Sequence, residues 1–247
     1  MGKKVKLELC SFSLNSSLVA QNDGADRIEL CGGFLEGGTT PSIGLVKKTL
    51  ESVEIPVYVM IRPRGGDFIY DDTEFQVMKE DIVEIKKLNP GGFVLGLLTA
   101  EGKIDTVKTK VLMELAHPCP VTFHRAFDVC EDPFEAIEDL IALGVENILT
   151  SGQQNTAEAG IELLRQLVIK ANGRINIMAG SGVGESNVLK FLKAGIDAVH
   201  FTAKKAVESK MIFRKESVKM GDDHIDEYIN FEADSEKVRK VKSLIQS

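Results

Sequence analysis

The sequence predicts a single-domain α/β protein of the (β/α)8 TIM-barrel class, and three observations support this fold. Eight short apolar runs alternate strictly with helical patterns along the 247 residues. Strict strand–helix alternation is typical of a parallel sheet with right-handed crossovers. Eight such units leave no residues for a second domain, which favours a closed barrel over an open doubly wound sheet.

A short phrase marks where several strands begin. Glycine, an apolar residue, an acidic residue and a strand-like run occur in this order at 24–30, 144–150 and 195–201, with a looser version at 89–98. Glycine is typical of the residue that ends a helix in a left-handed conformation. The expected strands, in chain order, are 5–10, 26–31, 56–61, 92–98, 120–124, 146–150, 175–179 and 197–201.

Helical patterns fill the intervals between these strands. Residues 73–88 place Phe75, Met78 and Ile82 three or four positions apart, on one face of a helix. The pattern at 133–143 begins with a proline behind Asp132, the residue types preferred at the first turn and the N-cap. The expected helices are 14–23, 42–52, 73–88, 105–116, 133–143, 156–170 and 185–194.

Residues 203–233 break this alternation, because they are polar and follow no clear period. We expect them to form a long irregular excursion after the eighth strand, ahead of a terminal helix at 234–245. No linker or low-complexity segment divides residues 1–247. The whole chain is therefore expected to be one domain.

Composition argues against several partners and settings. The formal net charge of −7 at pH 7 provides no basic surface for nucleic acid or for an anionic membrane. No apolar stretch approaches the roughly 18 residues of a membrane helix, and the N-terminus lacks the apolar segment of a secretory signal. Four scattered cysteines do not make a disulfide scaffold. We expect a cytoplasmic protein that binds neither nucleic acid nor membranes.

The tripeptide Glu-Leu-Cys ends the first two expected strands, at 8–10 and 29–31. Alternate residues of a strand share a face, and the leucine and isoleucine side chains form the only apolar face of each strand. That face should meet the surrounding helices. The residues expected to point into the barrel, at its C-terminal mouth, are Glu8, Cys10, Glu29 and Cys31.

Cys10 and Cys31 would then face each other across one gap between strands, about 4.8 Å wide. Two thiolates at that separation suit a soft ion such as Cu(I). Zinc would need four ligands, and no CxxC or HxxxH pattern supplies them. The alternative is that both cysteines are ordinary small buried residues, and the sequence leaves the two interpretations open.

Charged residues at other strand ends suggest a binding or catalytic site for a small anionic metabolite. Arg62 and Arg64 follow the third expected strand and could clamp a substrate, and Arg62 should also form a buried pair with Glu29. His124, after the fifth strand, is the candidate general acid or base, assisted by Glu29 or Asp128. The alternative is that these charges neutralise one another and only plug the barrel.

A glycine-rich loop follows the seventh expected strand and is a candidate anion-binding subsite. Backbone amides at Gly180, Ser181 and Gly182 would hold a phosphate at the start of the next helix, although a tight turn needs glycine in any case. Glu185 stands where a dinucleotide fingerprint requires glycine. We therefore expect no nucleotide cofactor.

Several of these segments together make the chain resemble the CutC family, the copper homeostasis proteins. The stretches that carry the resemblance are GADRIELC, EGGTTPS, MIRPRGGDF, VTFHRAFD, LTSGQ, IMAGSGV and FRKESVKMG, in this order between residues 24 and 221. The resemblance implies a cytoplasmic TIM barrel that self-associates as a dimer or higher oligomer and takes part in copper handling.

In that family Cu(I) binding is ascribed to two cysteines that end the first two strands, and these positions correspond to Cys10 and Cys31 here. The polar mouth exceeds what two-coordinate copper requires. An enzyme of unknown reaction, acting on a small anionic or phosphorylated metabolite, is therefore the alternative function.

Overall fold

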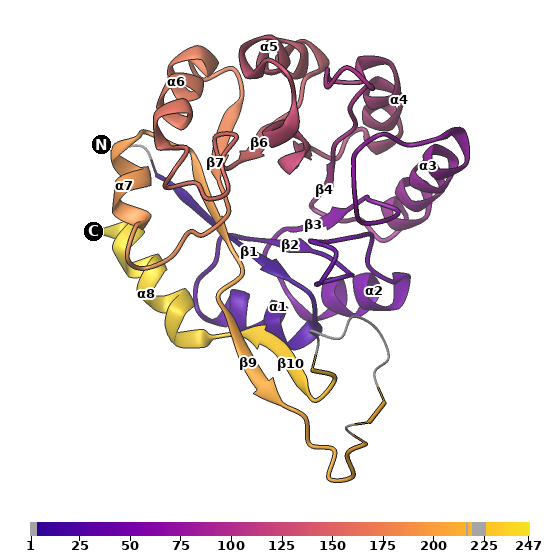
Figure 1. Cartoon of the computed structure of the whole chain (residues 1–247), viewed down its shortest axis with the longest axis vertical. Coiled ribbons are helices and arrows are strands. Elements are labelled where there is room, and N and C mark those ends of the chain that lie inside the picture. The colour runs from indigo at the N-terminus through magenta and orange to yellow at the C-terminus, as the bar shows by residue number, and fades with distance from the viewer. Residues whose placement is uncertain (1–3, 216, 219–225) are drawn as a thin grey trace.

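The computed structural model describes residues 4–215, 217–218 and 226–247, and these form the predicted closed barrel (Figure 1). Eight parallel strands pair in chain order, and β8 closes on β1. The eight expected strands are confirmed. The barrel strands are β1 (Lys6–Ser11), β2 (Arg27–Leu30), β3 (Val57–Met60), β4 (Gly92–Leu95), β5 (Val121–Phe123), β6 (Asn147–Thr150), β7 (Asn176–Ala179) and β8 (Ala198–Phe201).

Helices form a ring outside the barrel (Figure 1). A capping box at Asp71 and Glu74 starts α3, and Asp132 caps α5 by accepting hydrogen bonds from the backbone of its first turn. The α-helices are α1 (Leu14–Asn22), α2 (Ile43–Ser52), α3 (Asp72–Lys86), α4 (Thr106–Ala116), α5 (Pro133–Leu143), α6 (Ile161–Ala171), α7 (Val188–Lys193) and α8 (Ser235–Gln246). A short 3₁₀ helix, η1 (Arg125–Val129), follows β5.

Two helices begin later than the sequence predicts. Helix α6 starts at Ile161 instead of 156, because the loop before it folds back closely on itself: a Cβ added to Gly160 would lie 2.0 Å from the carbonyl oxygen of Ser151. Helix α7 starts at Val188 instead of 185. Both delays leave the segments after β6 and β7 free to form loops at the C-terminal end of the barrel.

The two faces of the first strands point as predicted. Leu7, Leu9, Ile28 and Leu30 are fully buried, in the cluster that also holds the inner faces of the helices. Residues on the opposite face of the strands form a separate, smaller cluster in the interior of the barrel. Its members are Cys10, Cys31, Tyr58, Met60 and Val94. The hydrophobic layer between strands and helices therefore fixes which side chains enter the lumen.

The segment after β8 is not wholly irregular, which corrects the prediction for 203–233. β9 (Lys204–Glu208) and β10 (Ile229–Ala233) form an antiparallel two-stranded sheet that projects from the barrel (Figure 1). These strands are mostly exposed, so they need no alternating apolar pattern, and no local pattern of residues predicts them. The base of the hairpin is attached to helix α1, where Ser16 Oγ accepts a hydrogen bond from the backbone of β10.

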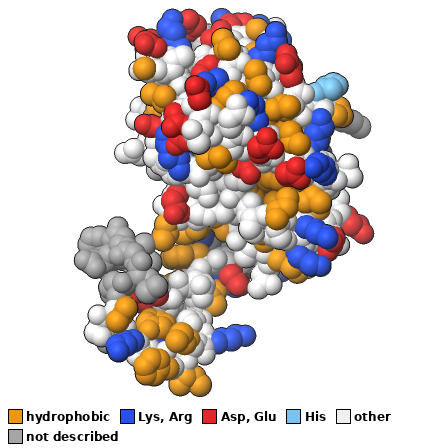
Figure 2. Space-filling view, turned by 90° about the vertical axis from the view of Figure 1, so that its right-hand side faces the viewer, with side chains coloured by type: hydrophobic (Ala, Val, Ile, Leu, Met, Phe, Trp, Pro, Cys, Tyr) orange, Lys and Arg blue, Asp and Glu red, His pale blue; other side chains and the backbone are white. Residues whose placement is uncertain are grey.

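Apolar side chains gather on the projecting part of this hairpin (Figure 2). Met211, Ile212 and Phe213 are exposed, Ile212 by 98%. Self-association stays a prediction, and burial of this exposed group would favour it. Among the described residues, no helix combines the length and the apolar character needed to cross a bilayer.

Candidate functional site

A cavity of about 1050 Å³ opens at the end of the barrel where the strands finish. The carboxyl ends of parallel strands meet at this end, which is where barrel enzymes place their sites. Side chains from β1, β2, β3, β6 and β8 line the cavity, together with the segment after β5, the loop after β7 and the start of the hairpin. The chemically active groups that line it include Cys10, Glu29, Arg62, His124 and His200.

The two cysteines meet at the base of this cavity, as the sequence predicts. Their sulfur atoms lie 3.9 Å apart. In the strand register Cys10 stands opposite Glu29, so Cys31 approaches it diagonally from the end of β2. Cys10 lines the cavity, whereas Cys31 is fully buried behind it. The glycine at 38 allows this packing, because a Cβ there would lie 3.3 Å from the Cys31 sulfur.

The two thiols of this pair have different pKa values. The hydrogen bond between the two sulfur atoms, against the effect of burial, lowers the pKa of Cys10 to about 6, and the neighbouring His200 adds to this shift. The same hydrogen bond and burial raise the pKa of Cys31 well above its usual value. Burial also raises the pKa of Glu29, whose Oε2 lies 3.5 Å from the Cys31 sulfur. Near neutral pH the pair is therefore a thiolate held by a thiol.

A second buried group lies directly below the cysteines. Glu8 accepts hydrogen bonds from Arg27 and, at 2.8 Å, from Nδ1 of His200. Burial raises the pKa of Glu8, but the charges of Arg27 and His200 outweigh it and the pKa is lowered. Burial lowers the pKa of His200, yet the surrounding Glu29, Cys10 and Glu8 raise it well above its usual value. The charges of Glu8, Arg27 and His200 thus compensate one another.

Sequence reasoning missed Arg27. It placed His200 at the end of the eighth strand but missed its contact with Glu8. Arg27 shares the inward face of β2 with Glu29, so the two-residue alternation that identified Glu29 could also have identified it. His200 comes into contact with Glu8 only because β8 pairs with β1, which follows from closure of the barrel. The guanidinium of Arg27 also lies 4.0 Å from the centre of the Tyr58 ring.

Among the residues that the structure describes, two overlapping sets of side chains could bind a metal ion. Cys10, Glu29 and Cys31 bring two sulfurs and one carboxylate oxygen within 4.8 Å of one another, and Glu8, Glu29 and His200 do the same with oxygen and nitrogen atoms. The second set is already engaged in ion pairs with Arg27 and within itself. The sulfur set suits a soft ion, because thiolate ligands select Cu(I) over hard cations such as Mg²⁺.

The predicted ion pair between Arg62 and Glu29 is wrong. The two Nη atoms of Arg62 donate to the backbone carbonyls of Glu36, Gly38 and Gly66 at 2.8–2.9 Å, so the loops after β2 and β3 hold the guanidinium. Nε of Arg62 and Oε1 of Glu29 are both buried without a hydrogen-bond partner. The predicted strand order placed the two residues on adjacent strands, but it could not show that backbone carbonyls of the loops would bind Arg62.

His124 lies at the cavity as expected, but its environment does not suit the predicted acid–base role. Burial, and then the charge of Arg62, lowers the pKa of His124 to about 3. Its Nδ1 accepts a hydrogen bond from the backbone N–H of Ala126 at 3.1 Å and so caps the helix η1. The imidazole is therefore neutral near pH 7 and works poorly as a proton donor or acceptor there.

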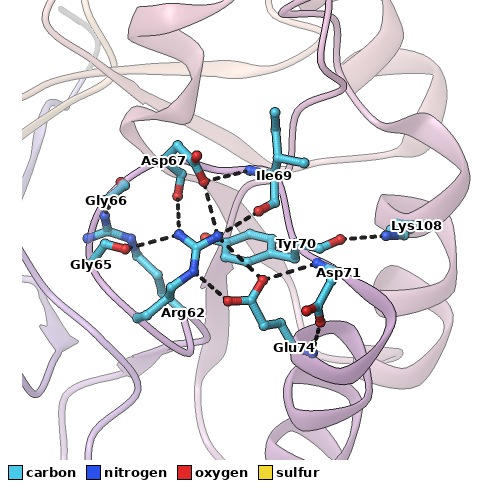
Figure 3. Close-up of polar contacts among 10 residues, drawn as sticks. Arg62, Gly65, Gly66, Asp67, Ile69, Tyr70, Asp71, Glu74 and Lys108 are labelled. Atoms are coloured by element: carbon cyan, nitrogen blue, oxygen red, sulfur yellow. Dashed lines mark hydrogen bonds and ion pairs between the residues drawn. The ribbon is translucent and has the colours of Figure 1, made fainter.

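Asp128 and Arg64 do not line the cavity, which corrects two further predictions. Oδ1 of Asp128 accepts hydrogen bonds from Thr150 Oγ1 and from the Ser151 backbone N–H, so this carboxylate braces the start of the loop after β6. Arg64 pairs with Glu74 of helix α3 and with Asp67. Figure 3 shows Gly65, Asp67 and Glu74 converging on one guanidinium group. Arg64 thereby fastens its own loop to α3.

The glycine-rich loop after β7 lines part of the cavity. Ser181 and Gly182 border it, with φ angles of 77° and 71°, but the Ser181 hydroxyl donates to the carbonyl oxygen of Asn155. Gly180 does not border it: its amide donates to Thr150, and a Cβ there would lie 2.5 Å from Leu149. Gly180 therefore serves close packing, and phosphate binding by this loop stays a prediction.

The sequence model of the CutC family matches residues 5–205. The chain belongs to the CutC family. CutC family proteins of Proteus mirabilis and Bacteroides fragilis strain YCH46 are 48% and 46% identical to it over 241 and 248 residues. These alignments cover 97% and 99% of this chain, and 96% and 98% of the relatives.

Solved structures agree with this membership. A CutC crystal structure from Streptococcus agalactiae, named for copper homeostasis, is 37% identical with a TM-score of 0.76, over 79% of this chain and 97% of that chain. A thiamine phosphate pyrophosphorylase from Pyrococcus furiosus has a TM-score of 0.59 at 15% identity, over 99% of this chain and 96% of that chain. The second likeness shows the barrel fold alone.

Proposed function

We propose that this CutC protein binds Cu(I) through Cys10 and Cys31 and takes part in copper homeostasis in the cytoplasm. The observation that carries the proposal is the 3.9 Å separation of the two sulfur atoms at the base of an open cavity. Metal–thiolate bonds of roughly 2.3 Å span about 4.6 Å when they are collinear. A small outward movement of one cysteine therefore suffices for a two-coordinate ion.

Charge supports the same two ligands. The thiolate is the form that binds a metal, and the pKa of Cys10, lowered to about 6, makes this form available near neutral pH. Cys31 has a raised pKa and must lose its proton when the ion binds. Metal binding that releases a proton becomes tighter as the pH rises. The apparent affinity for Cu(I) is therefore expected to increase with pH above neutrality.

The relatives support the biological setting. The structure from Streptococcus agalactiae is named for copper homeostasis, and its alignment covers 79% of this chain. Copper would be cargo in this role, and two soft ligands at the bottom of a cavity allow an ion to be passed to or from another carrier.

An anaerobic competition titration against a chromogenic Cu(I) chelator tests the proposal. Cys10→Ser and Cys31→Ser should each weaken Cu(I) binding by more than about a hundredfold, because second-shell changes alone cost roughly 10- to 100-fold. Cys119→Ser is the matched control, since that cysteine is free and lies outside the cavity. Wild-type affinity in the double variant of Cys10 and Cys31 would rule out these ligands.

The size of the cavity favours a second candidate function, an enzyme that acts on a small anionic metabolite. About 1050 Å³ is far more than one ion needs and lies at the upper end of the range for small-molecule sites. Lys204 and Lys237 stand at its rim. A screen of anionic metabolites for a rise in melting temperature tests this function, and the absence of any rise in both the copper-free and the copper-loaded protein argues against it.

A further inference from the structure

One corner of the cavity, formed by Arg62, Phe68 and His124, contains buried polar atoms without partners. His124 and Arg62 are 3% and 6% exposed, and both line the cavity. Nε2 of His124 and Nε of Arg62 have no hydrogen-bond partner. Buried polar groups are normally paired, and leaving one unpaired is unfavourable. Two such groups in one corner of a cavity indicate that a ligand supplies the missing partner.

The hydrogen bond at Nδ1 of His124 shows that its other ring nitrogen, Nε2, is a donor. Nδ1 accepts the backbone N–H of Ala126, so it carries no proton. A neutral imidazole has one N–H, and here it must be on Nε2. The ring is neutral because burial, and then the charge of Arg62, lowers the pKa of His124 to about 3. The corner therefore offers an N–H from His124 next to the N–H of a guanidinium.

The charge of Arg62 in this corner is not compensated by an acid. Its Nη atoms donate to three neutral backbone carbonyls, and among the described residues no carboxylate forms an ion pair with it. The Phe68 ring is a neighbour of both donors, with its centre 5.0 Å from Cζ of Arg62 and 5.0 Å from the centre of the His124 ring. A buried charge without a partner favours an anion at the same place.

We propose that this corner binds the carboxylate of a small organic acid, which accepts hydrogen bonds from Nε2 of His124 and Nε of Arg62. The apolar walls next to the corner, Met60 and Phe68, would contact the hydrocarbon or aromatic body of the same ligand. The site lies on the segments after β3 and β5, whereas the cysteines lie on β1 and β2. It does not depend on copper binding, and it gives the second candidate function a ligand class.

Two substitutions of His124 separate its two nitrogen atoms. The amide of asparagine reaches the position of Nδ1, so His124→Asn keeps the cap of η1 and removes the donor in the cavity. The longer glutamine reaches the position of Nε2, so His124→Gln keeps a donor in the cavity and removes the cap. A purely structural histidine would be replaced better by asparagine, and a ligand-binding one better by glutamine.

The experiment uses the copper-free full chain with ¹⁵N-labelled histidine, titrated with acetate and with benzoate, and with benzyl alcohol and inorganic phosphate as comparison probes. We expect the carboxylates to shift the Nε2 signal of His124 and not that of the exposed His117. Affinity for benzoate should fall by about tenfold or more in His124→Asn, the loss of one hydrogen bond to a charged group, and less in His124→Gln.

Tyr70→Phe is the control for the neighbouring group. The buried hydroxyl of Tyr70 also lacks a partner and lies close enough to Arg62 for the guanidinium to act on its pKa, but Tyr70 does not line the cavity. Its variant should bind benzoate like the wild type. The proposal is overturned if neither carboxylate shifts the His124 signal, if benzyl alcohol or phosphate shifts it equally, or if His124→Asn binds benzoate better than His124→Gln.

Discussion

Acidification should destabilise this protein through His124, and the size of the effect can be worked out. The pKa of His124 is about 3 in the folded chain, against 6.5 as the ordinary value. Between these values the unfolded chain binds more protons than the folded one, so stability falls as the pH falls. The contribution is fully present above about pH 6.5 and is lost progressively toward about pH 3. A pH of about 4 is roughly 2.5 units below the pKa of the histidine in the unfolded chain, which corresponds to a loss of about 3 kcal/mol in the free energy of unfolding.

Urea denaturation of the wild type and of His124→Asn over a series of pH values measures this effect. The variant has no imidazole to titrate at this position, so its free energy of unfolding should fall less, by about 3 kcal/mol, between about pH 7 and pH 4. Carboxylates that also titrate in acid are common to both proteins and cancel in the comparison. His117→Asn, at an exposed histidine, should keep the wild-type dependence. Identical acid dependence in wild type and His124→Asn would refute the reasoning.

Two further predictions concern the cavity wall and the cysteines. Gly96→Ala would place a Cβ 2.5 Å from the His124 ring and should lower the free energy of unfolding by about 1–3 kcal/mol. Gly44→Ala is the control, because its added Cβ meets nothing within 4 Å and should leave the free energy of unfolding unchanged. Equal effects of the two substitutions would argue against this contact. Iodoacetamide near neutral pH should modify Cys10, whose pKa is about 6, before Cys130, because burial raises the pKa of Cys130 to about 12. Peptide mass spectrometry measures the order of modification, and the reverse order would contradict this prediction.

Local patterns in the sequence were sufficient to predict the barrel and the inner face of its first strands. The alternation of side chains along a strand has a fixed period of two, so Leu7 and Leu9 facing the helices required Glu8 and Cys10 to face the lumen. The adjacent strand repeats the same tripeptide, and parallel pairing of β1 with β2 then brings its cysteine, Cys31, to the same place. These steps need only neighbouring residues and neighbouring strands.

Local sequence patterns could not predict the contacts made by loops or by closure of the barrel. The partners of Arg62 are backbone carbonyls, and every residue has one, so the sequence carries no signal for them. His200 reaches Glu8 across the seam between the last strand and the first. Asp128 turns away from the cavity because η1 redirects the chain after β5, a local helix with no apolar period of its own.

The central claim is that Cys10 and Cys31 together bind Cu(I), and X-ray absorption spectroscopy of the copper-loaded protein tests it most directly. The account predicts an absorption edge typical of low-coordinate Cu(I) and a first coordination shell made of two sulfur atoms. In Cys10→Ser and in Cys31→Ser one of these sulfur neighbours should be lost. A first shell of nitrogen and oxygen alone, or a spectrum unchanged in both variants, would contradict it.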